Sequence, residues 1–203
     1  MKNLITLFIL LIFTVHSYSQ KTYIWKPAEI AITEHKGLLS GDTVLLIIRD
    51  NRIKSIKSKE DVDPAELAND ITKNIKRSIP NSIINLLSDS LFYTKSRNES
   101  LTIKISIDYY GSAFGKDIQI IVGTTGYSSM SEIPSAKWIG VTGFTISIFD
   151  NRDKRELKFT TEIKEISQGM NLSGYSTSKK CLNESYTMAT NRLISFISQK
   201  LIE

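Results

Sequence analysis

Cysteine and histidine are scarce in this chain, and their scarcity excludes several kinds of protein. Among 203 residues there is one cysteine, Cys181, so no internal disulfide can form and a disulfide-stapled scaffold is excluded. Two histidines, His16 and His35, leave little material for a histidine-rich metal site. The 26 basic residues exceed the 21 acidic ones by only five, and they are spread evenly along the chain. Nucleic-acid binding needs concentrated positive charge, so we expect no nucleic-acid partner.

A long apolar run is present only near the N-terminus. It extends from Leu4 to Val15, follows a single lysine, and precedes two small residues, Ser17 and Ser19, spaced as in a signal-peptidase site. We therefore predict a signal peptide over residues 1–19, with the mature chain starting at Gln20. The alternative is a retained membrane anchor. Twelve helical residues, however, span only about 18 Å of a hydrocarbon layer about 30 Å thick.

The predicted export and the single cysteine together indicate a compartment. Many eukaryotic secreted domains of this size would use disulfides, so we expect a bacterial envelope protein, periplasmic or secreted. No cysteine lies near the expected cleavage site, so we expect no lipid anchor. No later segment approaches the roughly 18 apolar residues of a spanning helix, so we expect no membrane span after cleavage. Removal of Lys2 leaves 25 basic and 21 acidic residues, a charge of about +4.

The remaining sequence predicts an extended N-terminal arm over residues 20–42 and a single α+β domain over residues 43–203. Residues 44–48 (VLLII) form a continuous apolar run, which is typical of a strand buried on both faces. Asp63-Pro64-Ala65-Glu66 is a strong helix start, and apolar residues every four positions follow it as far as Ile79.

Further elements are predicted by alternation, by turn residues and by helical periodicity. They are a second short helix over 83–91, a half-exposed strand over 101–109, a turn at 111–115, a short strand over 118–122, a loop over 123–136, a hairpin of strands 137–149 and 156–166, a polar loop over 169–178, and a final amphipathic helix. The order predicts a mainly antiparallel sheet with helices packed on one face and a long C-terminal helix.

Catalytic chemistry has little support. A serine triad needs a histidine base, and the only histidine of the predicted mature chain, His35, lies in the arm. Cys181 is expected in the first turn of the final helix, where the helix dipole would favour a thiolate. We nevertheless interpret it as a small residue beside the apolar stripe rather than as a nucleophile. No metal-binding motif is present. We therefore assign no catalytic, cofactor-binding or metal-ligating residues and expect no cofactor.

Several segments resemble the YajG-like family of bacterial envelope lipoproteins. They are VLLIIRDNR at 44–52, the capped helix from Asp63, the strand LTIKISIDY, the hairpin around Phe149-Asp150-Asn151-Arg152, and the long final helix. The resemblance covers roughly residues 43–202 and implies a periplasmic accessory protein, with no catalytic residues to carry over. This chain differs from the family in lacking a lipobox cysteine and in carrying the arm at 21–42.

Together these observations predict an exported, non-enzymatic envelope protein of unknown role. It would bind a partner, expected to be an envelope protein, through its sheet edge or exposed loops; its oligomeric state stays open. The alternative is a secreted small-ligand binder or hydrolase with its site in the 123–136 loop, where Tyr127, Met130 and Trp138 could line a pocket. The basic cluster within residues 52–59 is either a solvated loop or a second candidate.

Overall fold

The computed structural model describes residues 22–38, 41–52, 62–87, 100–122, 128–151 and 156–200. The predicted signal peptide with its cleavage site, Tyr127, and the lysines of the 52–59 cluster lie outside these ranges. The helices and strands, in chain order, are β1 (Thr22–Tyr23), β2 (Thr43–Asp50), α2 (Pro64–Ser78), β3 (Ile83–Leu87), β4 (Leu101–Val122), β5 (Ser128–Asp150), β6 (Glu156–Met170) and α3 (Tyr175–Lys200).

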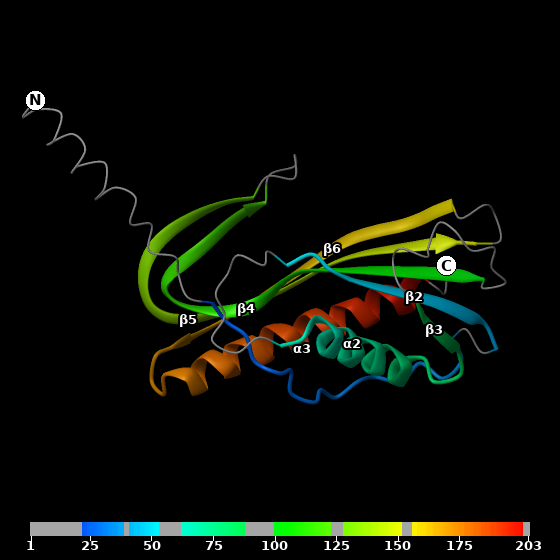
Figure 1. The fold of residues 1–203 in the computed structure, drawn as a ribbon, viewed down its shortest axis with the longest axis horizontal. Helices are drawn as coiled ribbons and strands as arrows, with labels where there is room; N and C mark the ends of the chain where they lie inside the picture. The colour runs from blue at the N-terminus through cyan, green and yellow to red at the C-terminus, as the bar shows by residue number, and fades with distance from the viewer. Residues whose placement is uncertain are drawn as a thin grey trace, which may run out of the picture.

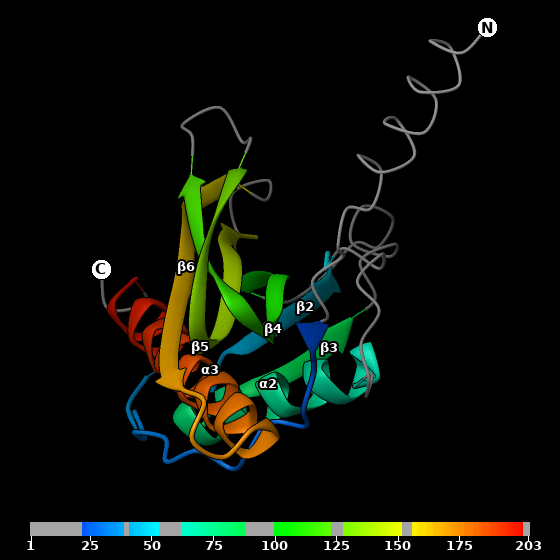
Figure 2. The same cartoon turned by 90° about the vertical axis from the view of Figure 1, so that its left-hand side faces the viewer.

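The α+β fold class is confirmed, but the sheet is mixed. Its strand order is β3-β2-β4-β5-β6, and β1 pairs with β4 beside this path. The pairs β2–β3 and β2–β4 are parallel, whereas β4–β5, β5–β6 and β1–β4 are antiparallel. Both helices lie against one face of the sheet (Figures 1 and 2). The parallel pairing of β2 with β3 arises because α2 carries the chain back along the sheet between the two strands.

The core lies between the sheet and these helices. β2 is central and buried, as its apolar run predicts. Asp63 caps α2 by accepting a hydrogen bond from the Ala65 amide at 2.9 Å. The fully buried stripe of α3 meets the sheet with residues at steps of three and four: Leu182, Tyr186, Ala189 and Leu193.

The segment before β2 packs on the helices. Ile24 and Ile30 are buried in the main core. The backbone amide of His35 donates to Ser78 O at 2.6 Å, and the Ala28 amide donates to Asn183 Oδ1 at 3.3 Å. These contacts hold residues 24–38 across both α2 and α3.

Four segments were assigned the wrong secondary structure, or the wrong extent, from the sequence. Residues 83–87 form strand β3 rather than a helix, because they pair with the free side of β2. The predicted turn at 111–115 and the short strand after it are parts of one continuous strand, β4. Residues 128–136, predicted as loop, belong to β5. The 169–178 loop is reduced to residues 171–174, because β6 and α3 extend into it.

Gly111 shows why the turn prediction failed. The glycine was interpreted as a turn signal, yet a Cβ there would lie 2.5 Å from the Thr22 Cγ2 atom of β1. The glycine therefore makes room for the Thr22 methyl group where β1 pairs with β4, and it does not form a turn. Beyond this point β4 and β5 stay paired as far as Val122 and Ser128, and this hairpin curves away from the other strands (Figure 1).

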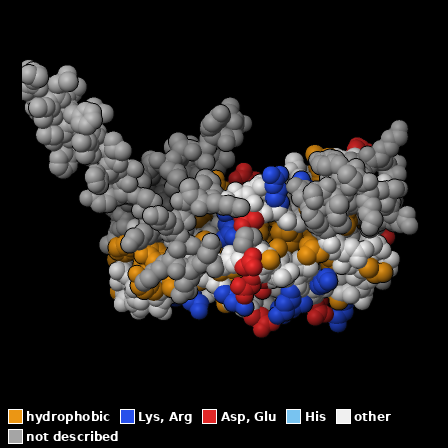
Figure 3. Space-filling view, viewed as in Figure 1, with side chains coloured by type: hydrophobic (Ala, Val, Ile, Leu, Met, Phe, Trp, Pro, Cys, Tyr) orange, Lys and Arg blue, Asp and Glu red, His pale blue; other side chains and the backbone are white. Residues whose placement is uncertain are grey.

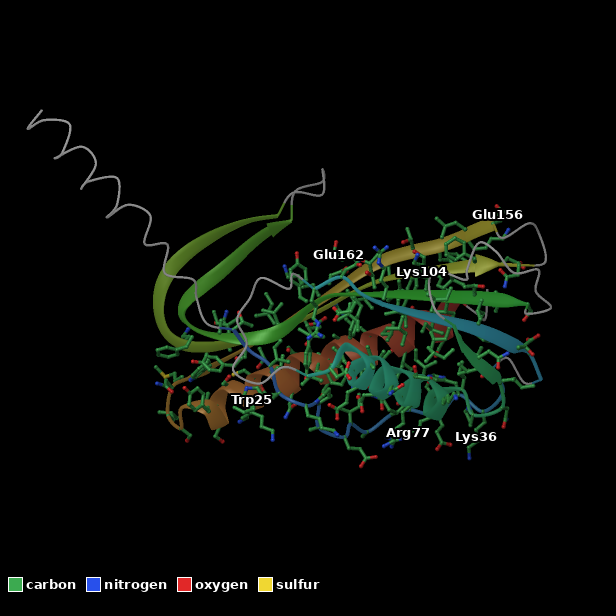
Figure 4. The ribbon with its side chains drawn as sticks, in the orientation of Figure 1. Trp25, Lys36, Arg77, Lys104, Glu156 and Glu162 are labelled. Atoms are coloured by element: carbon green, nitrogen blue, oxygen red, sulfur yellow. The ribbon has the colours of Figure 1, made fainter. Side chains whose placement is uncertain are left out.

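The sheet face away from the helices is polar over β4, β5 and β6. Lys104 and Glu162 project from this face in Figure 4. The Thr145 hydroxyl donates to Asp108 Oδ2 at 2.6 Å, and Ser147 and Thr160 share a hydrogen bond of 3.2 Å. Such pairs across neighbouring strands stabilise an exposed sheet face.

Candidate functional site

β6 forms one edge of the sheet, and its two halves differ in charge. Among the described strands, β6 has a neighbour on one side only, β5. Residues 156–165 carry five charged side chains, whereas residues 166–170 (ISQGM) carry none. Natural edge strands commonly use charged residues to prevent pairing with other chains. The stretch Ile166–Met170, which we call the edge segment, lacks this protection.

The edge segment is also exposed. Ile166 is 40% exposed and Met170 is 66% exposed, on the sheet face opposite α3. Ser167 and Gly169 face the helix instead: the Ser167 hydroxyl donates to Glu184 Oε2 at 2.6 Å, and Gly169 lies close to the Cys181 side chain. The contacts with α3 therefore fix the backbone of the edge segment while its outer side chains stay in solvent.

An open groove of about 840 Å³ adjoins the edge segment. Its β6 side is formed by Ile166, Ser167 and Gln168, and its α3 side includes Lys180, Asn183, Glu184 and Met188. Lys180 and Glu184 form an exposed ion pair of 3.8 Å, and Met188 is 39% exposed. The groove thus combines apolar and polar contacts beside an edge that can form backbone hydrogen bonds.

A second surface lies at the end of the molecule where β6 leads into α3. Five aromatic rings from separate segments contact one another there, with centroid distances of 5.0 to 6.2 Å: Tyr23, Trp25, Phe114, Trp138 and Tyr175. The Trp25 indole donates to Ser178 Oγ at 3.2 Å, and the Trp138 indole donates to Asn171 Oδ1 at 2.9 Å. We call this region the aromatic end.

Met130 and Trp138, two of the residues named in the alternative prediction, lie in strand β5 rather than in a loop. Trp138 is 5% exposed and packs within the aromatic end, and Met130 lies in β5, paired with Ile120. The ligand or hydrolase alternative depended on a long loop, and the pairing of residues 128–134 with β4 contradicts that loop. Nothing in this arrangement favours that alternative.

Cys181 does not lie where the sequence predicts. It is the seventh residue of α3 rather than a residue of its first turn, because the helix begins at Tyr175. The side chain is buried, and burial raises the pKa of the thiol above its usual value. The neutral thiol is therefore favoured, the opposite of what nucleophilic catalysis needs. Cys181 packs beside Gly169 under the sheet as a small core residue.

The described residues bring together no group of three or more histidine, cysteine or acidic side chains that could hold a metal ion. Neither α2 nor α3, the helices within the described ranges, has a stretch apolar and long enough to cross a membrane.

Sequence reasoning missed the edge segment. Residues 156–166 were correctly predicted as a strand, but the strand order of the sheet was not derivable, so nothing identified β6 as an edge. One signal was available: the change from a charged to an uncharged stretch at residue 166. The loss of charge indicates an unprotected edge only when the strand is known to lie at the edge of the sheet.

Comparisons with known proteins agree on the fold. No family model matches the chain, and no curated protein matches it. A solved structure from Xanthomonas campestris, of the DUF330 family model, matches with a TM-score of 0.53 and 8% identity, covering 87% of this chain and 94% of that one.

Two further solved structures have a TM-score of 0.50. One is a hypothetical protein from Chlamydia trachomatis, at 8% identity, covering 79% of this chain and 98% of that one. The other is described as a neuraminyllactose-binding hemagglutinin homolog from Helicobacter pylori, at 9% identity, covering 89% and 94%. At these identities the likeness is one of fold, shared with bacterial proteins of little-characterised role.

Proposed function

We propose that this chain is an exported, non-enzymatic accessory protein of the bacterial envelope that binds another envelope protein at the edge segment of β6. The observation that carries the proposal is an exposed, uncharged stretch of edge strand beside an open groove. The apolar run at residues 4–15 supports export, and the resemblance to YajG-like proteins supports an accessory role. Lipid attachment is not part of the proposal.

Strand addition is the binding mode that this geometry favours. An extended segment of the partner would form backbone hydrogen bonds with residues 166–170, which span about 17 Å at the usual strand rise. Alternate side chains of that segment would meet Ile166 and Met170 on one face and the groove on the other. The groove lining contains two lysines, Lys179 and Lys180, and one glutamate, Glu184, so it best accommodates an uncharged or acidic side chain.

The opposite edge of the main sheet is less suited to this role. Within the described residues β3 has five residues, and short edge strands are one of the ways in which proteins limit unwanted pairing. β6 has 15 residues, and its unprotected part is fixed from below by α3. A rigid edge loses less conformational entropy on binding than a mobile one.

Affinity capture with a matched pair of variants tests the proposal. The mature chain would be used to capture proteins from a bacterial envelope fraction, alongside Ile166→Lys and Leu157→Lys. Both positions are exposed leucine or isoleucine residues of β6, 40% and 49% exposed, but Leu157 lies in the charged half. We expect Ile166→Lys to lose the captured protein and Leu157→Lys to keep it.

The two parts of the proposal fail separately. Equal capture by both variants would exclude the edge segment as the binding surface. N-terminal sequencing of the protein from cells should find Gln20 as the first residue, and retention of Met1 would contradict export by a cleaved signal. Turnover of an envelope substrate by the purified mature chain would contradict the non-enzymatic role.

A further inference from the structure

Leu172, in the turn between β6 and α3, is 88% exposed on a well-fixed piece of backbone. The Leu172 amide donates to Met170 O at 2.8 Å, and the Ser173 amide donates to Thr177 Oγ1 at 3.3 Å. Gly174 adopts a positive φ of 55°, which favours glycine, and the chain then enters α3. The backbone of the turn is therefore held by hydrogen bonds, while the Leu172 side chain that it carries stays in solvent.

Further exposed apolar side chains belong to the segments at this end of the molecule. Tyr175 is 46% exposed, Phe114 is 37% exposed and Met170 is 66% exposed. The Trp138 ring contacts two of these side chains, with centroid distances of 5.0 Å to Phe114 and 6.0 Å to Tyr175. Apolar surface is visible at this end of the molecule in Figure 3. Clustered exposed apolar side chains mark interaction sites more often than scattered ones do.

The charge around this patch is mixed, with an excess of lysine. The segments that build the aromatic end, residues 22–28, 111–114, 137–140 and 168–183, contain four lysines, and two glutamates, Glu29 and Glu184, directly adjoin these segments. Lys26 and Lys180 pair with Glu66 and Glu184, which lie outside these segments. Lys137 directly precedes Trp138, and Lys179 follows Tyr175 by one helical turn. Positive charge around aromatic and apolar side chains is complementary to an anionic lipid surface.

The chain also enters the fold at this end. β1, at Thr22–Tyr23, pairs with Ala113 and Ser112 of β4, next to Phe114. The apolar run of the sequence ends at Val15, seven residues before Thr22. Before the predicted cleavage after Ser19, seven residues at full extension connect that run to β1 over at most about 25 Å. In the mature chain this connection is lost, and the exposed apolar side chains and the lysines are what could meet a membrane.

We propose that the aromatic end docks on an anionic lipid bilayer, with Leu172 inserted into the interface and lysines at the level of the headgroups. Tyr and Trp side chains are well suited to this depth, because one end of each ring system is apolar and the other is polar. The patch shares Met170 with the edge segment, but Leu172 lies outside that segment, so a variant at Leu172 separates this inference from partner binding.

Vesicle binding by the purified mature chain tests the proposal. The probes are vesicles of phosphatidylcholine alone and of phosphatidylcholine with phosphatidylglycerol, measured by co-sedimentation. The two tryptophans of the chain, Trp25 and Trp138, both lie in the aromatic end, so their emission gives a second readout. We expect binding to the anionic vesicles only, weakened by salt and accompanied by a change in tryptophan emission.

A matched pair of serine variants makes the test specific. Leu172→Ser should weaken binding about tenfold or more, because the apolar side chain that enters the bilayer is lost. Leu157→Ser removes a leucine that is 49% exposed on the charged half of β6 and should bind as the unchanged chain does. Both side chains are exposed, so both variants should fold, and thermal melts confirm this.

Three results would overturn the proposal: no sedimentation with either vesicle, equal loss of binding in both serine variants, or binding that ignores lipid charge. If Leu172→Ser lost a captured envelope protein while the unchanged chain ignored vesicles, the aromatic end would be a protein interface instead. Unchanged binding by Leu172→Ser would likewise refute insertion of this turn.

Discussion

Gly140 of β5 offers a sharp test of how α3 is seated on the sheet. A Cβ at this position would overlap the backbone carbonyl of Cys181 and would lie 2.5 Å from the Leu182 amide nitrogen. Carbon atoms in ordinary contact are about 3.5–4.0 Å apart, so the helix backbone would have to move by about 1 Å or more. The obstructing atoms are helix backbone rather than a flexible side chain. Gly140→Ala should therefore cost about 3 kcal/mol, the upper part of the usual range for overpacking.

Thermal unfolding followed by circular dichroism measures this effect. For a chain of this size, 1 kcal/mol corresponds to about 2–4 °C, so the melting temperature should fall by about 6–12 °C. Gly37→Ala is the matched control, because a Cβ there meets nothing within 4 Å. It should change stability by no more than about 0.5 kcal/mol. If Gly140→Ala melted within about 2 °C of the unchanged protein, the close approach of α3 to β5 would be refuted.

Three further predictions concern single side chains. Leu193 is fully buried, so Leu193→Ala should cost about 2–5 kcal/mol in thermal melts. Arg192→Ala removes an exposed arginine from its ion pair with the largely buried Glu165 and should cost less, about 1 kcal/mol. Equal losses in the two variants would refute the orientation of the helix. Burial lowers the pKa of Lys164, so the charged side chain reduces the stability of the folded chain at neutral pH, and this loss disappears as the pH rises toward 10.5. Lys164→Met should therefore raise the melting temperature at pH 7 and raise it less near pH 10. Cys181 should react with a thiol reagent only when the chain unfolds, and rapid labelling of the folded chain would contradict its burial. Cys181→Ser should leave partner capture intact.

The elements that local patterns specify were predicted well. The buried run at 44–48 identified a central strand, the Asp63 cap marked the start of α2, and four-and-three spacing identified the buried face of α3. Each of these signals depends on residues close in sequence. Arg192 shows the limit of such signals: it lies one position from the buried Leu193, and local spacing does not predict its ion pair with Glu165 of β6.

The elements that depend on distant partners were predicted poorly. Residues 83–87 are apolar enough for either a helix or a strand, and only the free side of β2 makes them a strand. Gly111 was interpreted by its usual role in turns, whereas the arrival of β1 explains it. The candidate binding surfaces also depend on segments that are distant in sequence. An uncharged stretch such as residues 166–170 becomes a binding surface only when the strand order places it at an edge.

The two proposed surfaces adjoin, and their proximity predicts how they would act together. Met170 is the last residue of the edge segment and lies two residues from Leu172. A chain docked on a bilayer through the aromatic end would hold the edge segment close to the lipid surface. Docking would then raise the effective concentration of any partner that is itself bound to the membrane. Capture of such a partner from intact membranes should therefore weaken in both Ile166→Lys and Leu172→Ser. Capture of the same partner from detergent extracts should depend on Ile166 alone, and an equal loss in Leu172→Ser there would show that the aromatic end contacts the partner directly.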